Sequence, residues 1–221
     1  MARSTVIHFR SGTGAVEKIE RLEKTVTRRP FTDTNIYYFR KLVGKIVRMY
    51  EGGKYVPALV VDVRIEKLGD LRDRDAREEG FRNLEEFRSV WRTIYGGFSP
   101  EQRVVAIEFV GYGCWRFEPG KRVVIDGIEV PLCRGFRHGR DLDRRCLFCW
   151  LSPVQWCGNC RHLEQRGSRR VCRALGEGVA IERLRRVPSY GCQLYERRVP
   201  QPVRTALAKL RSLGIERVED P

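Results

Sequence analysis

The feature that most constrains this chain is the spacing of its eight cysteines. Two Cys-x-x-Cys sequences, Cys146 to Cys149 and Cys157 to Cys160, follow one another with seven residues between them. Such a turn presents two thiolates to one metal ion, which is half of a tetrahedral site. The surrounding segment is poor in apolar residues, so we expect metal binding to supply much of its folding free energy.

The cysteines divide in chain order into two sets of four. Each set contains one Cys-x-x-Cys turn, one further cysteine and one Tyr-Gly-Cys sequence, which ends at Cys114 in the first set and at Cys192 in the second. The glycine permits a turn whose backbone N–H groups point at the sulfur. The predicted ligands are Cys114, Cys133, Cys146 and Cys149 for site 1, and Cys157, Cys160, Cys172 and Cys192 for site 2.

Three interpretations of these cysteines compete. Structural zinc comes first because four thiolates in a tetrahedron suit that ion. An iron–sulfur cluster at one or both sites is the alternative, because four cysteines also hold such clusters and the spacing does not separate the two. Disulfides come third, since they are usual in secreted chains. His138 and His162 lie among the cysteines and could each replace a ligand, or be surface histidines in a basic segment.

Charge points to a polyanionic partner. The net charge is +15, and arginine supplies most of it, with 35 Arg against 8 Lys. Residues 131–221 carry 19 basic and nine acidic side chains, so the cysteine-rich half is the more basic half. Arginine grips phosphate with two parallel hydrogen bonds and stacks on bases. Nucleic acid is therefore the expected partner.

Length and hydrophobicity favour a folded protein. A chain of 221 residues holds one large domain or two small ones, and 42% hydrophobic residues suffice for a core. The longest apolar runs fall well short of a membrane-spanning helix. The first residues, Met1 to Ser4, lead into a short polar-flanked stretch that does not resemble a signal peptide. We expect a cytoplasmic protein with no membrane contact.

Periodicity and turn residues predict a mixture of strands and helices. The expected strands are Thr5–Phe9, Lys24–Pro30, Gly44–Tyr50, Val56–Ile65 and Arg103–Val110, with a hairpin of Lys121–Asp126 and Ile128–Leu132 turning at Asp126-Gly127. The expected helices are Ala15–Leu22, Asp73–Glu79, one that Asn83 caps and Gly96-Gly97 ends, and Arg204–Leu213.

Residues 4–111 resemble the ASCH family, a branch of the PUA-like β-barrel superfamily. The order and spacing of several short pieces carry the resemblance. They are Glu23-Lys24-Thr25-Val26-Thr27-Arg28-Arg29, Gly44-Lys45-Ile46-Val47, Ala58-Leu59-Val60-Val61-Asp62-Val63, Asp75-Ala76-Arg77-Glu78-Glu79-Gly80-Phe81, Leu84-Glu85-Glu86-Phe87, Trp91 to Tyr95, and Ile107-Glu108-Phe109.

The resemblance implies an α+β fold, a small mixed β-barrel with flanking helices. We divide the chain into an ASCH-like domain over residues 1–112, a cysteine-rich metal-binding module over 113–198, and a C-terminal helix and tail over 199–221. The family is associated with RNA through a cleft beside the barrel. The region from Cys114 onward lies outside the resemblance.

The resemblance also suggests a catalytic site. Some ASCH proteins resemble small amidohydrolases that act on N4-acetylcytidine through a Lys, a Thr and a Glu in these motifs. Here Thr27 would be the nucleophile, Lys24 its base and Glu79 the group that handles protons on the leaving nitrogen. Residues 24 and 27 of a regular strand face opposite sides, so a bulge or turn must bring them together. Alternatively Lys24 and Arg28 bind phosphate while Thr27 packs in the strand.

Basic and aromatic residues supply candidate RNA contacts. Tyr37, Tyr38 and Phe39 offer stacking faces, although at least two of the three rings are expected in the core, Phe39 before Tyr37. The predicted contacts are Arg28, Arg29, Tyr37, Arg40, Lys41, Lys45, Arg137, Arg140, Arg144, Arg145, Arg169 and Arg170.

These observations lead us to expect an RNA-binding protein in which the barrel and the metal module together hold structured RNA, such as tRNA or rRNA. An amidohydrolase acting on N4-acetylcytidine or a related nucleoside is the alternative. A third possibility is a ribosome-associated adaptor whose metal module is a rigid platform.

Overall fold

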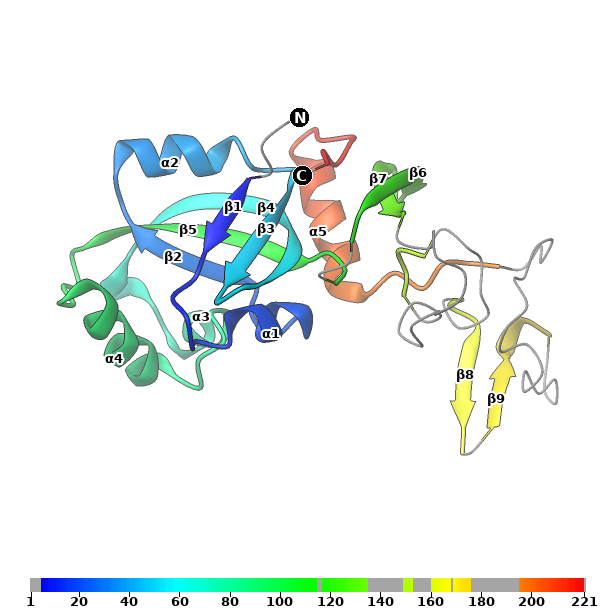
Figure 1. The fold of residues 1–221 in the computed structure, drawn as a ribbon, viewed down its shortest axis with the longest axis horizontal. Helices are drawn as coiled ribbons and strands as arrows, with labels where there is room; N and C mark the ends of the chain where they lie inside the picture. The colour runs from blue at the N-terminus through cyan, green and yellow to red at the C-terminus, as the bar shows by residue number, and fades with distance from the viewer. Residues whose placement is uncertain are drawn as a thin grey trace.

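The structure is a computed structural model that describes residues 5–114, 117–134, 149–152, 160–167, 169–175 and 195–220. Its centre is one mixed sheet with the strand order β1-β3-β4-β5-β2 (Figure 1). The strands are β1 (Val6–His8), β2 (Val26–Pro30), β3 (Ile46–Glu51), β4 (Lys54–Lys67) and β5 (Arg103–Gly111). The expected mixed α+β architecture is confirmed.

The sheet has two edge strands, which matter for the site described below. β1 pairs in parallel with β3, whereas the other neighbours are antiparallel. β1 and β2 are the two edge strands, and within the described residues they do not pair with each other, so the sheet does not close into a complete barrel. The register of β4 on β5 shifts between Val60 and Asp62, which marks a β-bulge.

Helices cover both sides of the sheet. α1 (Ala15–Glu20) and α2 (Asp33–Arg40) lie below and above the strands in Figure 1, and both pack into one hydrophobic cluster with the sheet. α3 (Asp73–Glu78) and α4 (Leu84–Tyr95) pack together in a separate cluster. Thr32 caps α2, because its hydroxyl accepts a hydrogen bond from the Asn35 N–H. Phe39 is buried, as expected, but Tyr37 is 65% and Tyr38 is 44% exposed, so the expectation that at least two of the three rings lie in the core is wrong.

The predicted end signals act as expected in α4 and in the hairpin. The Asn83 side chain accepts from the Glu86 N–H at the start of α4, and Gly96 ends the helix with φ of 78°. β6 (Pro119–Ile125) and β7 (Ile128–Cys133) turn at Asp126 and Gly127, both with positive φ, as a tight hairpin requires.

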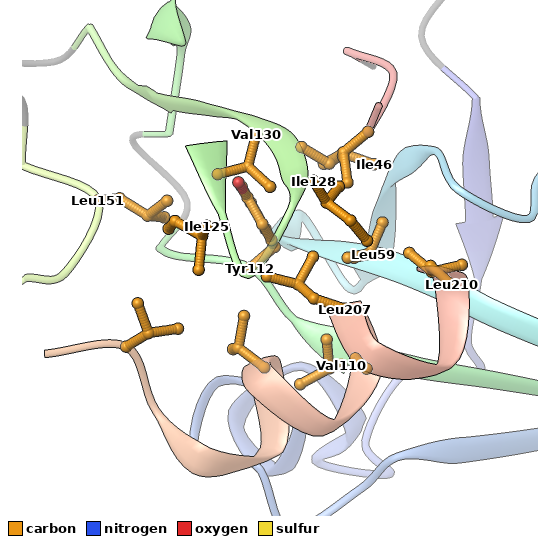
Figure 2. Packing of buried hydrophobic residues seen from close by; sticks show 14 of the residues in the cluster. Ile46, Leu59, Val110, Tyr112, Ile125, Ile128, Val130, Leu151, Leu207 and Leu210 are labelled. Carbon is orange, nitrogen blue, oxygen red and sulfur yellow. The ribbon is translucent and has the colours of Figure 1, made fainter. Parts of the chain in front are cut away.

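The C-terminal helix α5 (Gln201–Ser212) packs back onto the sheet. Its Leu207 and Leu210 are fully buried against strand residues such as Leu59 and Val110 and against Ile128 of the hairpin (Figure 2). Figure 2 shows these side chains converging from α5, the hairpin and the sheet into one cluster. The sheet therefore shares a hydrophobic core with segments that follow residue 112.

Ion pairs fasten the same elements together. Lys209 of α5 lies 3.0 Å from Asp62 and 2.8 Å from Glu108 of the sheet. Arg204 binds both carboxylate oxygens of Asp126 at the hairpin turn. The boundaries that we predicted between barrel, module and tail remain predictions. No helix in the described part of the chain is long and apolar enough to cross a membrane.

Candidate functional site

A cavity of about 240 Å³ opens beside the gap between β1 and β2. Its walls come from the segment after β1, from β2, from the end of α3 and from α4. It is lined by His8, Phe9, Arg10, Thr13, Ala15, Lys18, Lys24, Thr27, Arg29, Glu79, Phe81, Val90, Ile94 and Tyr95. The three predicted catalytic residues Lys24, Thr27 and Glu79 thus line one cavity, and each is at least 90% buried.

Lys24 reaches this cavity because it precedes the regular strand. Leu22 has φ of 63°, which ends α1 and redirects the chain. The Thr25 N–H donates to the Glu78 carbonyl, and the Thr25 carbonyl accepts from the Phe109 N–H, each at 2.8 Å. Strand pairing begins only at Val26. Lys24 therefore lies in the segment before β2, where side chains do not have to alternate between the two faces of a sheet. This segment provides the turn that brings residues 24 and 27 to the same cavity.

Glu79 is positioned by the end of α3. The Phe81 N–H donates to the Ala76 carbonyl at 3.0 Å across Gly80, whose φ of 84° favours glycine. The Lys24 ammonium donates to the Glu79 carbonyl at 2.8 Å and to its Oε2 at 3.0 Å. Arg28 Nη1 lies 3.4 Å from the other carboxylate oxygen. Two cations therefore share one buried carboxylate.

Thr27 is oriented by a neighbour on its own strand. Arg29 Nη1 donates to Thr27 Oγ1 at 2.9 Å, and Arg29 Nη2 donates to the His8 carbonyl at 2.9 Å. Because Thr27 accepts this bond, its hydroxyl proton remains available to a base. The second bond carries the Arg29 side chain across the gap between β2 and β1. We predicted Arg29 as an RNA contact, and its place in this cavity was missed.

The electrostatics of the cavity act on Lys24. Burial lowers the pKa of Lys24 below its ordinary value, and the positive charges of Arg29 and Arg28 lower it further, while Glu79 opposes both. A lysine with a lowered pKa has a larger neutral fraction and so can accept a proton. The arrangement suits Lys24 to the role of a general base.

Aromatic rings form part of the same wall. The Phe9 ring lies between two cations, with Lys24 Nζ 5.6 Å and the Arg29 guanidinium 5.3 Å from its centroid. Phe81 and Tyr95 also line the cavity. Flat rings beside hydrogen-bonding groups are what an aromatic ligand such as a nucleobase requires.

A second cavity, of about 660 Å³, lies behind β2 and is closed by α5. Its charged residues pair with one another: Arg64 binds Glu66 and Glu108, and Lys209 binds Asp62 and Glu108. Thr25 and Glu78 also line it, so the segment that carries Lys24 separates the two cavities. We find no group in this larger cavity suited to covalent chemistry, because its charged groups are already paired.

The predicted RNA contacts whose side chains the structure describes lie in separate places. Arg28 is buried, with its Nε 2.7 Å from Glu66, and this burial argues against a phosphate contact. Lys45 pairs with Glu219 at 2.7 Å. Tyr37 and Arg40 of α2 and Lys41 just after it are exposed, and none of them lines the cavity. Arg137, Arg140, Arg144 and Arg145 lie outside the described residues, and Arg169 and Arg170 are described only as backbone of β9 (Arg169–Cys172).

The described cysteines fall in two regions. In site 1, Cys133 and Cys149 pack against the same apolar cluster, and the Cys133 N–H donates to the Leu151 carbonyl at 2.8 Å. In site 2, Cys172 of β9 pairs opposite Leu163 of β8 (Leu163–Arg166), whose N–H donates to the Cys160 carbonyl. The hairpin therefore brings Cys160 and Cys172 to the same end.

Cys146, Cys157 and Cys192 lie outside the described residues. Among the residues that are described, no group of three or more potential metal ligands is found. The two metal sites remain predictions.

Comparison with known proteins gives limited similarity. No family model matches the chain, and no curated protein matches it. An ASCH domain from Lactobacillus crispatus JV V101 is similar in structure, with 16% identity and a TM-score of 0.40 over 48% of this chain and 78% of that domain. A protein from Enterococcus faecalis V583 placed in DUF984 gives 18% identity and a TM-score of 0.35 over 52% and 80%. These values do not assign the chain to a family, so its function must be inferred from its own residues.

Proposed function

We propose that the protein is an amidohydrolase that removes an acyl group from the exocyclic nitrogen of a cytosine base, with N4-acetylcytidine as the model substrate. One observation carries the proposal: Lys24, Thr27 and Glu79 line a single cavity, and the Lys24 ammonium contacts the Glu79 carboxylate at 3.0 Å. The cavity, at about 240 Å³, is smaller than the roughly 300–1,000 Å³ typical of drug-sized ligands, which favours a compact substrate.

The chemistry follows from the positions of these groups. Neutral Lys24 accepts the hydroxyl proton of Thr27, and Thr27 Oγ1 attacks the acyl carbon to form a tetrahedral oxyanion. Arg29 contacts Thr27 Oγ1 at 2.9 Å, so its positive charge lies near the acyl carbon under attack and would stabilise the oxyanion. The C–N bond then breaks, and the proton held between Lys24 and Glu79 passes to the leaving nitrogen. Cytidine leaves at this step, and water then hydrolyses the threonyl ester to release acetate and restore the Thr27 hydroxyl.

The test is the release of cytidine from N4-acetylcytidine, followed by chromatography. We expect Thr27→Ala and Lys24→Met to lower kcat/KM by at least about 1,000-fold, as removal of a nucleophile or its base does elsewhere. Thr25→Ala is the matched control, because Thr25 lines the other cavity and should retain activity. A wild-type protein without turnover on this substrate would contradict the proposal.

RNA binding is the second candidate function, and one observation on α2 favours it. Tyr37 is 65% exposed, and Lys41 Nζ lies 4.0 Å from its ring centroid, which places a stacking face beside a cation. With a net charge of +15, the chain should bind RNA with an affinity that falls steeply as salt rises. Equal binding at low and high salt would count against this function, as would unchanged binding in Tyr37→Ala.

We also propose that the eight cysteines bind two structural zinc ions, with an iron–sulfur cluster as the alternative. The turn at Cys160 and the pairing of Cys172 opposite Leu163 support the second site. Metal analysis of the purified protein should give about two zinc ions per chain, because four thiolates saturate each tetrahedral ion. A brown protein that contains iron would favour the alternative.

A further inference from the structure

We infer that the ligand of the Lys24–Thr27–Glu79 cavity carries a phosphate group, so that the substrate is an acylated nucleotide, either free or within RNA, rather than a neutral nucleoside. The inference deepens the proposed function and depends on it for the identity of the base. The phosphate itself is inferred from the charges of the cavity.

Positive side chains exceed negative ones in this cavity. Four cationic residues line it, and Glu79 is the carboxylate among the lining residues. Glu79 is already shared by Lys24 and Arg28. The remaining lining cations are Arg10, Lys18 and Arg29. In the described part of the chain none of these three forms an ion pair.

The contacts of these three cations leave donors available. Arg10 is exposed and makes one long hydrogen bond, of 3.4 Å, to the Thr93 carbonyl. Lys18 donates one of its three protons to the Gly80 carbonyl at 2.8 Å. Arg29 donates to neutral oxygens, namely Thr27 Oγ1 and two backbone carbonyls. The hydrogen bond from the Arg82 N–H and, to a lesser degree, the charge of nearby Lys18 lower the pKa of Glu86, but none of the three cations is in direct contact with a described carboxylate.

The larger cavity does not show this excess. In the larger cavity, Arg64 and Lys209 each bind two carboxylates. The chain therefore pairs its cations in one cavity and leaves them unpaired in the other. Unpaired cations that converge on a partly enclosed site attract an anion. Hydrogen bonds from these cations to a phosphate are stronger than hydrogen bonds between neutral groups.

The aromatic rings and the cations together define the ligand. The Phe9 ring lies near Lys24 and Arg29, and Tyr95 lines the same cavity, whereas Arg10 contacts the Thr93 carbonyl and Lys18 the Gly80 carbonyl. A base against the rings with a phosphate at Arg10 and Lys18 satisfies both sets of residues. A neutral nucleoside would leave the excess charge uncompensated.

The test measures binding without turnover. Dissociation constants of cytidine, cytidine 5′-monophosphate and a short cytidine-containing RNA are determined by calorimetry on the full chain at fixed salt. We expect the monophosphate to bind at least about tenfold tighter than cytidine, because two charge-assisted hydrogen bonds are added. Equal affinities of the three ligands would overturn the inference.

Variants separate the cavity from the general positive charge of the protein. Arg10→Gln and Lys18→Gln, singly and together, should remove the preference for the monophosphate and leave cytidine binding unchanged. Arg48→Gln is the matched control, since Arg48 is exposed but does not line the cavity. A preference for the monophosphate that survives in the double variant would overturn the inference.

Failure of the proposed reaction and failure of the phosphate site give different results. If the monophosphate is preferred but no acyl bond is hydrolysed, the proposed reaction is wrong and the phosphate site stands. If N4-acetylcytidine is hydrolysed but cytidine and its monophosphate bind equally, the reaction stands and the phosphate site is wrong. Tighter binding of the RNA than of the monophosphate, lost in the same variants, would identify RNA as the source of the phosphate.

Discussion

Arg28 and Arg29 are adjacent in β2, yet their side chains lie in different environments. Neighbouring strand residues face opposite sides of a sheet, so Arg29 shares a face with Thr27 whereas Arg28 does not. Arg29 enters the cavity, and Arg28 is buried against Glu66 and Glu79. This period of two in the sequence could have added Arg29 to the candidate site. The approach of Glu66 to Arg28 joins residues far apart in the chain, and no local pattern predicts it.

The pH dependence of the reaction should report on Lys24. The neutral amine is the active form, so kcat/KM should rise with pH through the pKa of Lys24, which burial holds below its ordinary value. Glu79→Gln removes the negative charge that raises this pKa, so the rising limb should move to lower pH even though the rate falls.

Glu78→Gln is the control for this shift, because Glu78 lines the other cavity and should leave the limb in place. Initial rates measured across pH at low substrate concentration give the position of the limb. A limb that stays fixed in Glu79→Gln would exclude Lys24 as the base.

At the level of elements, the sequence predicted helices and strands well where capping and turn residues are local. Asn83, Gly96 and the Asp126-Gly127 turn act as their residue types dictate. The segment around Tyr37 was not assigned, because two tyrosines and a phenylalanine in a row do not show a clear helical face. Its hydroxyl cap at Thr32 is the local signal that could have identified α2.

The strand order and the position of α5 depend on long-range packing, which local periodicity does not encode. Leu207 and Leu210 lie within the predicted helix Arg204–Leu213, and both are buried. Their partners on the sheet and the hairpin became visible only in the fold (Figure 2).

The packing of α5 predicts a clear difference between two leucines. Leu207→Ala should lower the free energy of unfolding by roughly 2–5 kcal/mol, because Leu207 is fully buried and its removal leaves a cavity. Leu213→Ala should change it by less than about 0.5 kcal/mol, because Leu213 is 55% exposed just after the helix. Urea unfolding followed by circular dichroism measures both. Equal effects would mean that α5 does not pack as described.

On the scale of the whole molecule, the resemblance covers residues 4–111, yet the core extends beyond them. Ile46 and Leu59 of the sheet pack with Ile128 of the hairpin and Leu210 of α5. Residues 4–111 are thus covered by chain segments that follow them, and the metal-binding module is predicted from cysteine spacing alone. No sequence pattern indicated that the end of the chain returns to the sheet.

A chain cut after residue 112 tests this dependence. Without α5 and the hairpin, the side chains of Ile46, Leu59 and Val110 would become exposed to water. We expect the fragment to unfold at a lower temperature than the full chain and to bind an apolar dye. Calorimetry and dye fluorescence measure both properties. An unchanged melting temperature would show that residues 1–112 form an independent domain.

Because β1 and β2 do not pair within the described part of the chain, the Arg29 side chain that connects them takes part both in the fold and in the candidate site. Arg29 connects Thr27 of β2 to the His8 carbonyl at the end of β1. An anion that binds Arg29 competes with those two oxygens for its hydrogen-bond donors. Binding of the anion therefore weakens the connection between β2 and β1. In the proposed reaction, departure of the product would return the Arg29 donors to Thr27 and to the His8 carbonyl.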